Sequence, residues 1–210
     1  MKFNSKIAVI LVALTTLVFA KGIAAQEGSY PVITNSWPSS FDELDAFRTQ
    51  NGSTPEGAVV SLIAALDLFT KDPVEGAKGL VLVLDPSSLQ ADSTGKGYKG
   101  FIVNKSTLGL VERQLQQNPL LINSYLPGSS PSNGYSITEP PYTFTLTANR
   151  YSGEAAKGKI KLFIPSSGAS SARPVTVTRN SKGVWKVSEF SSILVGVAKA
   201  SNVANPADDI

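Results

Sequence analysis

The sequence predicts an α+β fold in which N-terminal helices pack on one face of a curved, antiparallel sheet of four or more strands formed by the C-terminal half. Two observations predict it. Between residues 54 and 117 apolar residues recur with helical spacing, whereas beyond Leu126 the period changes to two, as in YTFTLT. Helices followed by strands along a chain are typical of an α+β domain in which one layer covers the other.

The first 25 residues have the pattern of a secretory signal peptide. Lys2 and Lys6 precede an uncharged, mostly apolar run at residues 7–20, and small residues follow it. We predict cleavage after Ala25, with Ala20 as the alternative. An uncleaved anchor is the competing interpretation, but the run falls short of the roughly 20 apolar residues that span a bilayer. The expected protein is exported, and is periplasmic, cell-surface or extracellular, with no stable membrane span after cleavage.

Removal of this segment leaves a neutral protein. The chain has 19 basic and 16 acidic residues, and Lys2, Lys6 and Lys21 lie in the first 25 residues without any acidic residue. A neutral surface lacks the positive charge that nucleic-acid binding requires, so we expect no nucleic-acid partner. Cysteine and histidine are both absent from the sequence. Their absence excludes Cys/His zinc sites and histidine-dependent nucleophiles, and the sequence predicts no catalytic residue, no metal and no cofactor.

Helix signals place a short lead and one domain after the signal peptide. The lead at residues 26–53 contains a short helix over FDELDAFR, with Ser40 as its N-cap. A single α+β domain is expected at residues 54–200, followed by a flexible tail at 201–210. Its first helix begins with Thr54 as cap and Pro55 at the first position. The apolar stripe of this helix consists of Val59, Leu62, Ile63, Leu66 and Phe69.

Two further helices are expected before the strands. Asp72 and Pro73 repeat the start signal, and the GLVLVLD that follows is either the buried end of this helix or a central strand, with the helix favoured. A glycine-rich turn, STGKGYKG, then leads to a helix that begins at Asn104 or Ser106 and is limited by Pro119.

The C-terminal half supplies the predicted strands. YTFTLT and PVTVT alternate polar and apolar residues, KIKLFI does so in part, and VWKVSEF follows the turn NSKG. The connection SSGASSARPV at residues 166–175 is longer than most hairpin loops. We interpret it as a connector with one recognition residue, Arg173, whose guanidinium either forms an internal salt bridge or binds an anionic ligand.

Aromatic residues are the other candidates for ligand binding. Tyr125, Tyr135 and Tyr142 lie within or beside loop sequences. Their rings and hydroxyls suit sugars or peptides, yet the same groups also anchor loops on a core. Trp185 alternates with a charged lysine and is expected in the core beneath the helices. Together with Arg173, these four residues form the predicted ligand-binding set.

The resulting hypothesis is a non-catalytic, exported module that binds a small molecule, a glycan or a partner protein. Two alternatives stay open. Ser93 and Lys96 fit the Ser-x-x-Lys pattern of histidine-free hydrolases, although they fall in a glycine-rich turn and not at the start of a helix. The other alternative is a structural protein of the cell envelope.

Three segments together resemble a known family. They are TPEGAVVSLIAALDLFTKDPVEG, INSYLPGSSPSNGYSITEPPYTFTL and KLFIPSSGASSARPVTVTRNSKGVWKVSEFSSILVGV, which together cover about residues 54–199. The chain is similar to the bacterial Domain of Unknown Function 6935 family (DUF6935), which implies a bacterial, often exported or envelope-associated protein without an assigned activity. The order of helices and sheet is also similar to the nuclear transport factor 2-like fold, a scaffold that hosts both enzymes and binding modules.

Overall fold

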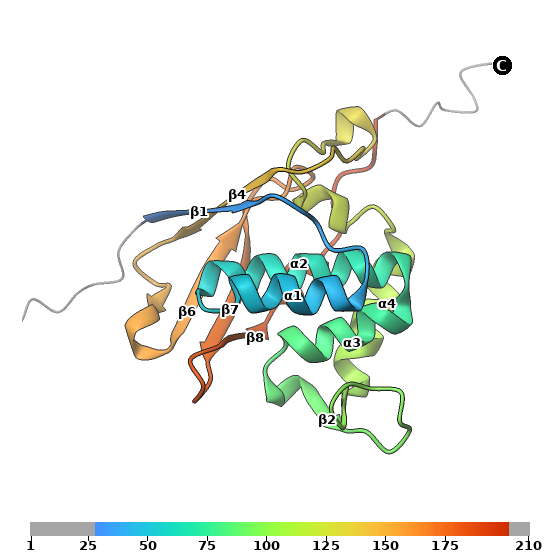
Figure 1. Ribbon diagram of the computed structural model, residues 1–210. Helices are drawn as coiled ribbons and strands as arrows, with labels where there is room; N and C mark the ends of the chain where they lie inside the picture. Colours follow the sequence, from blue (N-terminus) through green and yellow to red (C-terminus); the bar gives the residue numbers. More distant parts are fainter. Residues whose placement is uncertain (1–27, 202–210) are drawn as a thin grey trace, which may run out of the picture.

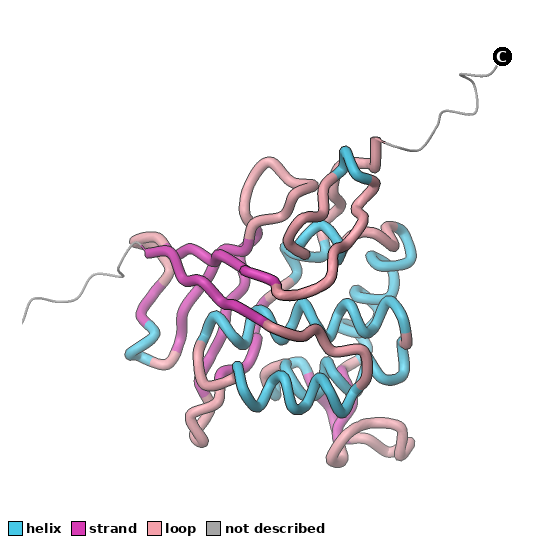
Figure 2. The backbone as a smooth tube through the Cα atoms, turned by 45° about the horizontal axis from the view of Figure 1, so that its top comes forward, coloured by secondary structure: helices cyan, strands magenta, loops and turns pink. Residues whose placement is uncertain are grey.

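The computed structural model describes residues 28–201, so the predicted signal peptide and all but the first residue of the predicted tail lie outside it. Within this range the chain forms a helical layer and an antiparallel sheet, as Figure 1 shows along the sequence. Figure 2 separates the two layers by secondary structure. The predicted α+β fold, with helices on one face of the sheet, is confirmed.

Four α-helices form the helical layer. They are α1 (Phe41–Asn51), α2 (Pro55–Lys71), α3 (Pro73–Val83) and α4 (Lys105–Gln117). Each begins where a side-chain oxygen accepts a hydrogen bond from the first turn, and the capping residues are Ser40, Thr54, Asp72 and Asn104. The ambiguous GLVLVLD segment is therefore mainly helical, as favoured from the sequence.

The large sheet has the strand order β1-β4-β6-β7-β8, and a short strand, β5, pairs with β6. Its strands are β1 (Gly28–Thr34), β4 (Tyr142–Ala148), β5 (Gly153–Glu154), β6 (Lys159–Ile164), β7 (Arg173–Arg179) and β8 (Trp185–Glu189). Alternate residues of β4 and β6 are buried, so one face of the sheet packs on the helices. A separate small hairpin, β2 (Leu89–Ala91) and β3 (Phe101–Val103), flanks the glycine-rich turn.

Strand β1 is a feature that the sequence did not predict. The lead was expected to hold one short helix, but its first residues pair with β4 along their full length, from Gly28 opposite Ala148 to Thr34 opposite Tyr142. Pro31 lies within the strand, and proline is tolerated there because β1 is an edge strand of the sheet in the described range. The sheet is thus larger than the four strands that were named.

Helix α2 lies at the centre of the molecule. Residues 57–69 are all buried, because α1 and α3 flank the helix and β6, β7 and β8 lie behind it. A helix enclosed on every side is apolar around its circumference. Its contact with α3 is so close that a Cβ atom on Gly76 would lie 2.2 Å from the Cα atom of Phe69.

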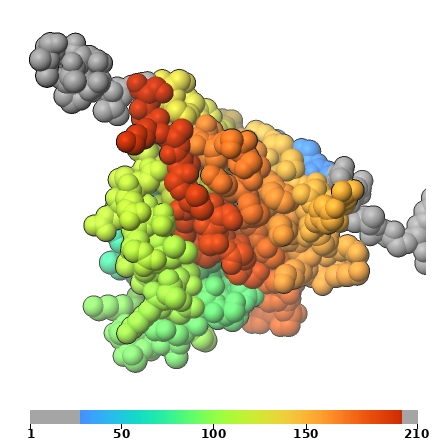
Figure 3. Space-filling model, turned by 180° about the vertical axis from the view of Figure 1, so that it is seen from behind, coloured from blue at the N-terminus to red at the C-terminus, as the bar shows by residue number. Residues whose placement is uncertain are grey.

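The C-terminal segment closes the other side of the molecule. After β8 the chain forms a short 3-10 helix, η5 (Ser191–Leu194), in which Ile193 and Leu194 are buried. Figure 3 shows this segment, in red, running between the α4 region and the β7 region. The segment thereby connects the helical layer to the sheet.

Candidate functional site

Two of the predicted ligand-binding residues, Tyr125 and Arg173, lie together. Tyr125 is buried, and its hydroxyl donates a hydrogen bond of 2.9 Å to the carbonyl oxygen of Ile193. Burial raises the pKa of the Tyr125 hydroxyl, and the nearby positive charge of Arg173 opposes that rise. Within residues 28–201 Arg173 forms no ion pair and its buried Nε has no hydrogen-bond partner, so the expected internal salt bridge is not found.

The other two predicted tyrosines anchor loops. The Tyr135 hydroxyl donates to the carbonyl oxygen of Ala198 over 2.6 Å, and the Tyr142 hydroxyl donates to that of Thr138. Burial raises the pKa of both tyrosine hydroxyls. Each buried hydroxyl is thus satisfied by a backbone carbonyl, and a ligand contact at these residues stays a prediction.

Trp185 lies in the core as expected, at the opposite end of β7 from Arg173. It is 4% exposed and pairs with Arg179, whose guanidinium carbon lies 5.7 Å from the centre of the indole ring. Because Arg173 stands at the first residue of β7 and Arg179 at the last, the predicted residues do not converge on one site.

Ser93 and Lys96 lie in the exposed loop between β2 and β3, and their side chains form no hydrogen bond with each other in the described structure. Asp92 organises this loop by accepting hydrogen bonds from the backbone of Thr94, Gly95 and Gly97. Among the residues that the structure describes, no hydrogen bond connects Ser93 with Lys96. The geometry therefore gives no support to the Ser-x-x-Lys hydrolase.

The most unusual polar residue of the core is Asp67, which the sequence reasoning did not single out. It lies on α2 and is 1% exposed. Its Oδ2 accepts hydrogen bonds from Trp37 Nε1, at 2.8 Å, and from Lys71 Nζ, at 2.7 Å. Its Oδ1 is buried and has no hydrogen-bond partner in the described chain. A buried carboxylate oxygen without a donor is costly, which makes it a natural acceptor for a bound group.

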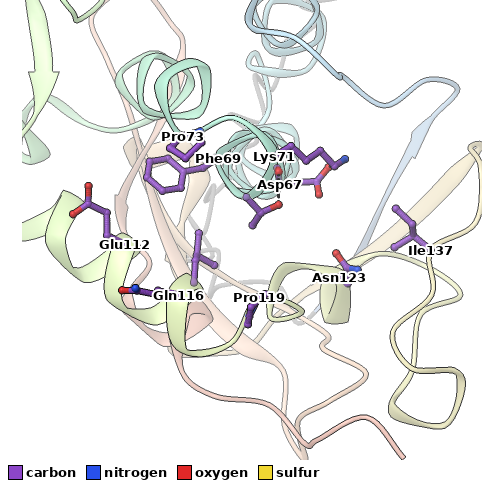
Figure 4. A pocket seen from close by; sticks show the side chains of 11 residues that line it. Asp67, Phe69, Lys71, Pro73, Glu112, Gln116, Pro119, Asn123 and Ile137 are labelled. Atoms are coloured by element: carbon purple, nitrogen blue, oxygen red, sulfur yellow. Dashed lines mark hydrogen bonds and ion pairs between the residues drawn. The ribbon is translucent and has the colours of Figure 1, made fainter. Parts of the chain in front are cut away.

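A cavity of about 720 Å³ lies beside this carboxylate, between α2, α4 and the segment that follows α4. Figure 4 shows this cavity from close by. Asp67 and Lys71 lie on the same side of the cavity as Asn123 and Ile137, and Glu112 and Gln116 lie on its opposite side. The remaining lining residues are Phe69, Thr70, Pro73, Leu115 and Pro119.

The charges around this cavity are unevenly paired. Lys71 forms an ion pair with Asp67, and its side chain is 49% exposed. Glu112 is exposed and forms no ion pair within residues 28–201. One lysine therefore faces two carboxylates, and the surplus charge of the lining is negative.

A second, mainly apolar cavity of about 300 Å³ adjoins the first and shares Phe69, Pro73 and Glu112 with it. It lies between α3, α4 and the β2–β3 hairpin. Its apolar lining includes Val74, which is 63% exposed, together with Ala77, Val81, Ile102, Val103 and Leu108. Two lysines, Lys78 and Lys96, also line this cavity. The two cavities form a groove with a polar end at Asp67 and an apolar end at Val81.

Asp67 carried a sequence signal that could have revealed it. It is an acidic residue in the mostly apolar run SLIAALDLF, and the residues on either side of it in this run are hydrophobic. Charged residues are rarely fully buried unless they are paired. Its partner Trp37 lies 30 residues away, and that contact depends on the fold.

Two classes of site find no support in the described part of the chain. Residues 28–201 contain no group of three or more acidic residues that could hold a metal ion, and the sequence has no histidine or cysteine. No helix in this range is long and apolar enough to cross a membrane.

Comparison with protein families shows to which family this chain is related. The model of the family described as Domain of unknown function (DUF6935) matches residues 36–201. The chain belongs to the DUF6935 family. The resemblance predicted from its sequence motifs is thereby confirmed, and the match spans α1 to the end of the described chain. No curated protein and no solved structure matches this DUF6935 chain, and the likeness to the nuclear transport factor 2-like fold stays a prediction.

Proposed function

We propose that the protein is an exported binding module that holds a small molecule in the groove beside Asp67. The observation that carries the proposal is that Asp67 lines a cavity and that the buried Oδ1 of its carboxylate has no hydrogen-bond partner in the described chain. A polar group buried without a partner in the free protein gains a hydrogen bond when a ligand supplies the donor.

The chemistry of the groove limits the ligand to one class. An ionised carboxylate is only an acceptor, so the ligand must donate, through an amine or a hydroxyl group. At the polar end of the groove, the charge of Asp67 and Glu112 would repel a ligand carboxylate or phosphate. Lys78, which pairs with Glu75, and Lys96 lie at the other end. The apolar end of the groove suits a hydrocarbon chain or ring. We therefore infer a small amphipathic ligand with a hydrogen-bond donor at one end.

Trp37 provides a direct test because its indole nitrogen donates to the same carboxylate. The chain has two tryptophans, and a Trp185→Phe variant leaves Trp37 as the sole tryptophan, whose fluorescence can be excited separately from that of the tyrosines. We expect n-hexylamine and n-hexanol to change its fluorescence saturably, whereas hexanoate has no effect. Equal binding of hexanoate would contradict the proposed ligand class.

The contribution of Asp67 is tested by Asp67→Asn, with Asp42→Asn as the matched control. Both variants remove one negative charge, but Asp42 is exposed on α1 and lines none of the cavities described. By calorimetry, we expect Asp67→Asn to weaken hexylamine binding roughly tenfold or more, since a charged hydrogen bond is lost. Asp42→Asn is expected to bind as the wild type does. Unchanged binding by Asp67→Asn would remove the basis of the proposal.

Export is proposed from the first 25 residues of the sequence, independently of the groove. Expression of the full chain in a bacterial host, followed by mass spectrometry of the protein outside the cytoplasm, tests it. We expect a mature chain that begins at Gln26, or at Lys21 if cleavage follows Ala20. An unprocessed chain retained in the cytoplasm would show that the segment is not a signal peptide.

A further inference from the structure

The large sheet splits between β4 and β6. These strands are joined by one residue pair, Thr147 with Phe163. Continuing the same antiparallel register would place Thr145 opposite Pro165, yet β6 ends at Ile164 and no such pair forms among the described residues. Proline cannot donate to the ladder, so the chain leaves the sheet at this point.

A cavity of about 360 Å³ occupies the split. One wall is β4 at Thr143–Thr145, and the other is the start of the β6–β7 loop at Ile164–Ser167. The segment Ser124–Ser129 forms the rest of the lining. None of the lining residues is charged, so the cavity favours a neutral ligand.

At Thr143–Thr145, the edge of β4 that faces this cavity has no partner strand within residues 28–201. In an antiparallel strand, the N–H and C=O groups of every second residue point to the same neighbour. Thr147 pairs with β6, so the backbone groups of Thr145 and Thr143 point to that side as well. Pro31 stands opposite Thr145 on β1 and has no N–H to offer, which agrees with this alternation. Strand β4 therefore presents a short length of open ladder to the cavity.

One buried side chain of the lining is also unpaired. Ser129 is 6% exposed, and its hydroxyl has no hydrogen-bond partner in the part of the chain that the structure describes. By contrast, the hydroxyls of Ser124 and Ser166, which line the same cavity, are joined by a hydrogen bond of 2.9 Å. The site thus combines an open strand edge with one free buried hydroxyl.

We propose that this cavity is a second binding site, which takes a short, extended, uncharged peptide segment as an added strand on β4. The alternating N–H and C=O groups of a peptide backbone match the open ladder of Thr143 and Thr145, and a sugar has no such repeat. The Ser129 hydroxyl bonds one further polar group of the peptide. The site is separate from the Asp67 groove, with which it shares no lining residue.

Amide NMR of the isotope-labelled protein tests the proposal. The probe is a pool of short capped peptides built from Ala, Ser, Thr and Val, and the control is the same pool with alternate amide nitrogens methylated, which removes ladder donors. We expect the first pool to shift the Ser129, Thr143 and Thr145 signals and to slow hydrogen exchange at Thr145, and the second to do neither. Shifts caused equally by both pools, shifts caused only by N-acetylglucosamine, or no shift at all would each overturn it.

Ser129→Ala separates binding from folding. Loss of one hydrogen bond is expected to weaken peptide binding about fivefold. The melting temperature should stay equal or rise, because the variant removes a buried hydroxyl that has no partner. Ser132→Ala is the control, since Ser132 is exposed and lies outside the cavity lining, and it should leave affinity unchanged. Equal affinity of Ser129→Ala and the wild type would exclude Ser129 from the site.

Discussion

Two regions of the molecule contain buried residues but are held together differently: the surroundings of α2, and the loop corner, which comprises residues 121–135, 165–172 and 190–201. Around α2 the contacts are mainly apolar, and thirteen consecutive residues of the helix are buried, although one of them, Asp67, accepts a hydrogen bond from Trp37. In the loop corner the buried contacts include hydrogen bonds from side chains to distant groups. The Tyr125 hydroxyl bonds Ile193, the Tyr135 hydroxyl bonds Ala198, and the Ser124 hydroxyl bonds Ser166.

The two regions are held by different kinds of contact, yet both contain an unpaired buried polar atom. Apolar packing is insensitive to direction, whereas each hydrogen bond fixes one atom against another. Each region nevertheless contains a buried polar atom without a partner beside a cavity, Asp67 Oδ1 near α2 and Ser129 Oγ in the loop corner. Native proteins leave few such atoms, and the two proposed sites are built on them.

The largest expected effect tests the close packing around α2. In Gly76→Ala, the added methyl group would meet backbone atoms of Phe69 at 2.2 and 2.4 Å, so α3 must move away from α2. We expect a loss of about 3 kcal/mol or more in the free energy of unfolding, measured by urea denaturation.

Gly109→Ala on α4 is the matched control for that substitution. The nearest atom to its added methyl group is a terminal nitrogen of Arg113, at 3.6 Å. Because alanine is the better helix former, this variant should gain about 0.5–1 kcal/mol. If both glycine variants changed stability alike, close approach of α3 to α2 would not explain the first result.

A smaller effect is expected in the loop corner. Tyr125→Phe keeps the ring but removes the hydroxyl that bonds the Ile193 carbonyl oxygen. The carbonyl is then left without this donor, which costs about 1–3 kcal/mol. Thermal unfolding measures the loss, and exposure of the C-terminal segment to a protease should increase with it. Full stability in Tyr125→Phe would mean that hydrogen bonds do not hold this corner.

The smallest effect concerns Lys186, a partly buried lysine at the junction of β8 with the end of α3. Its ammonium group donates to the Leu82 carbonyl oxygen. Burial and, to a smaller extent, the charge of Arg48 lower the pKa of Lys186 to about 8, although Asp45 and Asp85 oppose the change. Since the unfolded chain keeps this lysine protonated at higher pH, stability must rise as the pH increases above the folded pKa.

Denaturation curves between about pH 8 and 9.5 test this, because the buried tyrosines stay neutral in that range. Allowing for partial solvent screening, we expect the wild type to gain about 1 kcal/mol across the interval relative to Lys186→Met. A wild type and a Lys186→Met variant with parallel pH profiles would show that Lys186 is not desolvated.

Local signals in the sequence predicted most of the fold. Caps such as Thr54 and Asp72 begin helices because their oxygens bond the next turn, and the alternation of YTFTLT matches a strand with one buried face. Strand β1 was missed because its partner β4 lies far along the chain and Pro31 argued against a strand.

The candidate sites depended on contacts that no local pattern encodes. Lys71 follows Asp67 by one helical turn, a spacing that is common for ion pairs on exposed helix surfaces. The sequence does not show that the Asp67 side chain of this pair is buried. The open edge at Thr145 exists because Pro165 ends the pairing of a different strand. For the tyrosines, the sequence left two roles open, ligand binding and loop anchoring. Only the folded positions of Ile193 and Ala198 show that the hydroxyls of Tyr125 and Tyr135 bond distant backbone carbonyls.

The pairing of β1 with β4 also has a consequence for the order of assembly. Gly28 pairs with Ala148, so the first strand waits for a partner made roughly 120 residues later, and such distant pairings form slowly. Until β4 has been made, β1 has no strand to pair with, and nascent chains are exposed to mispairing with one another. A chaperone bound during synthesis would protect the amino-terminal strand until β4 is available to pair with it.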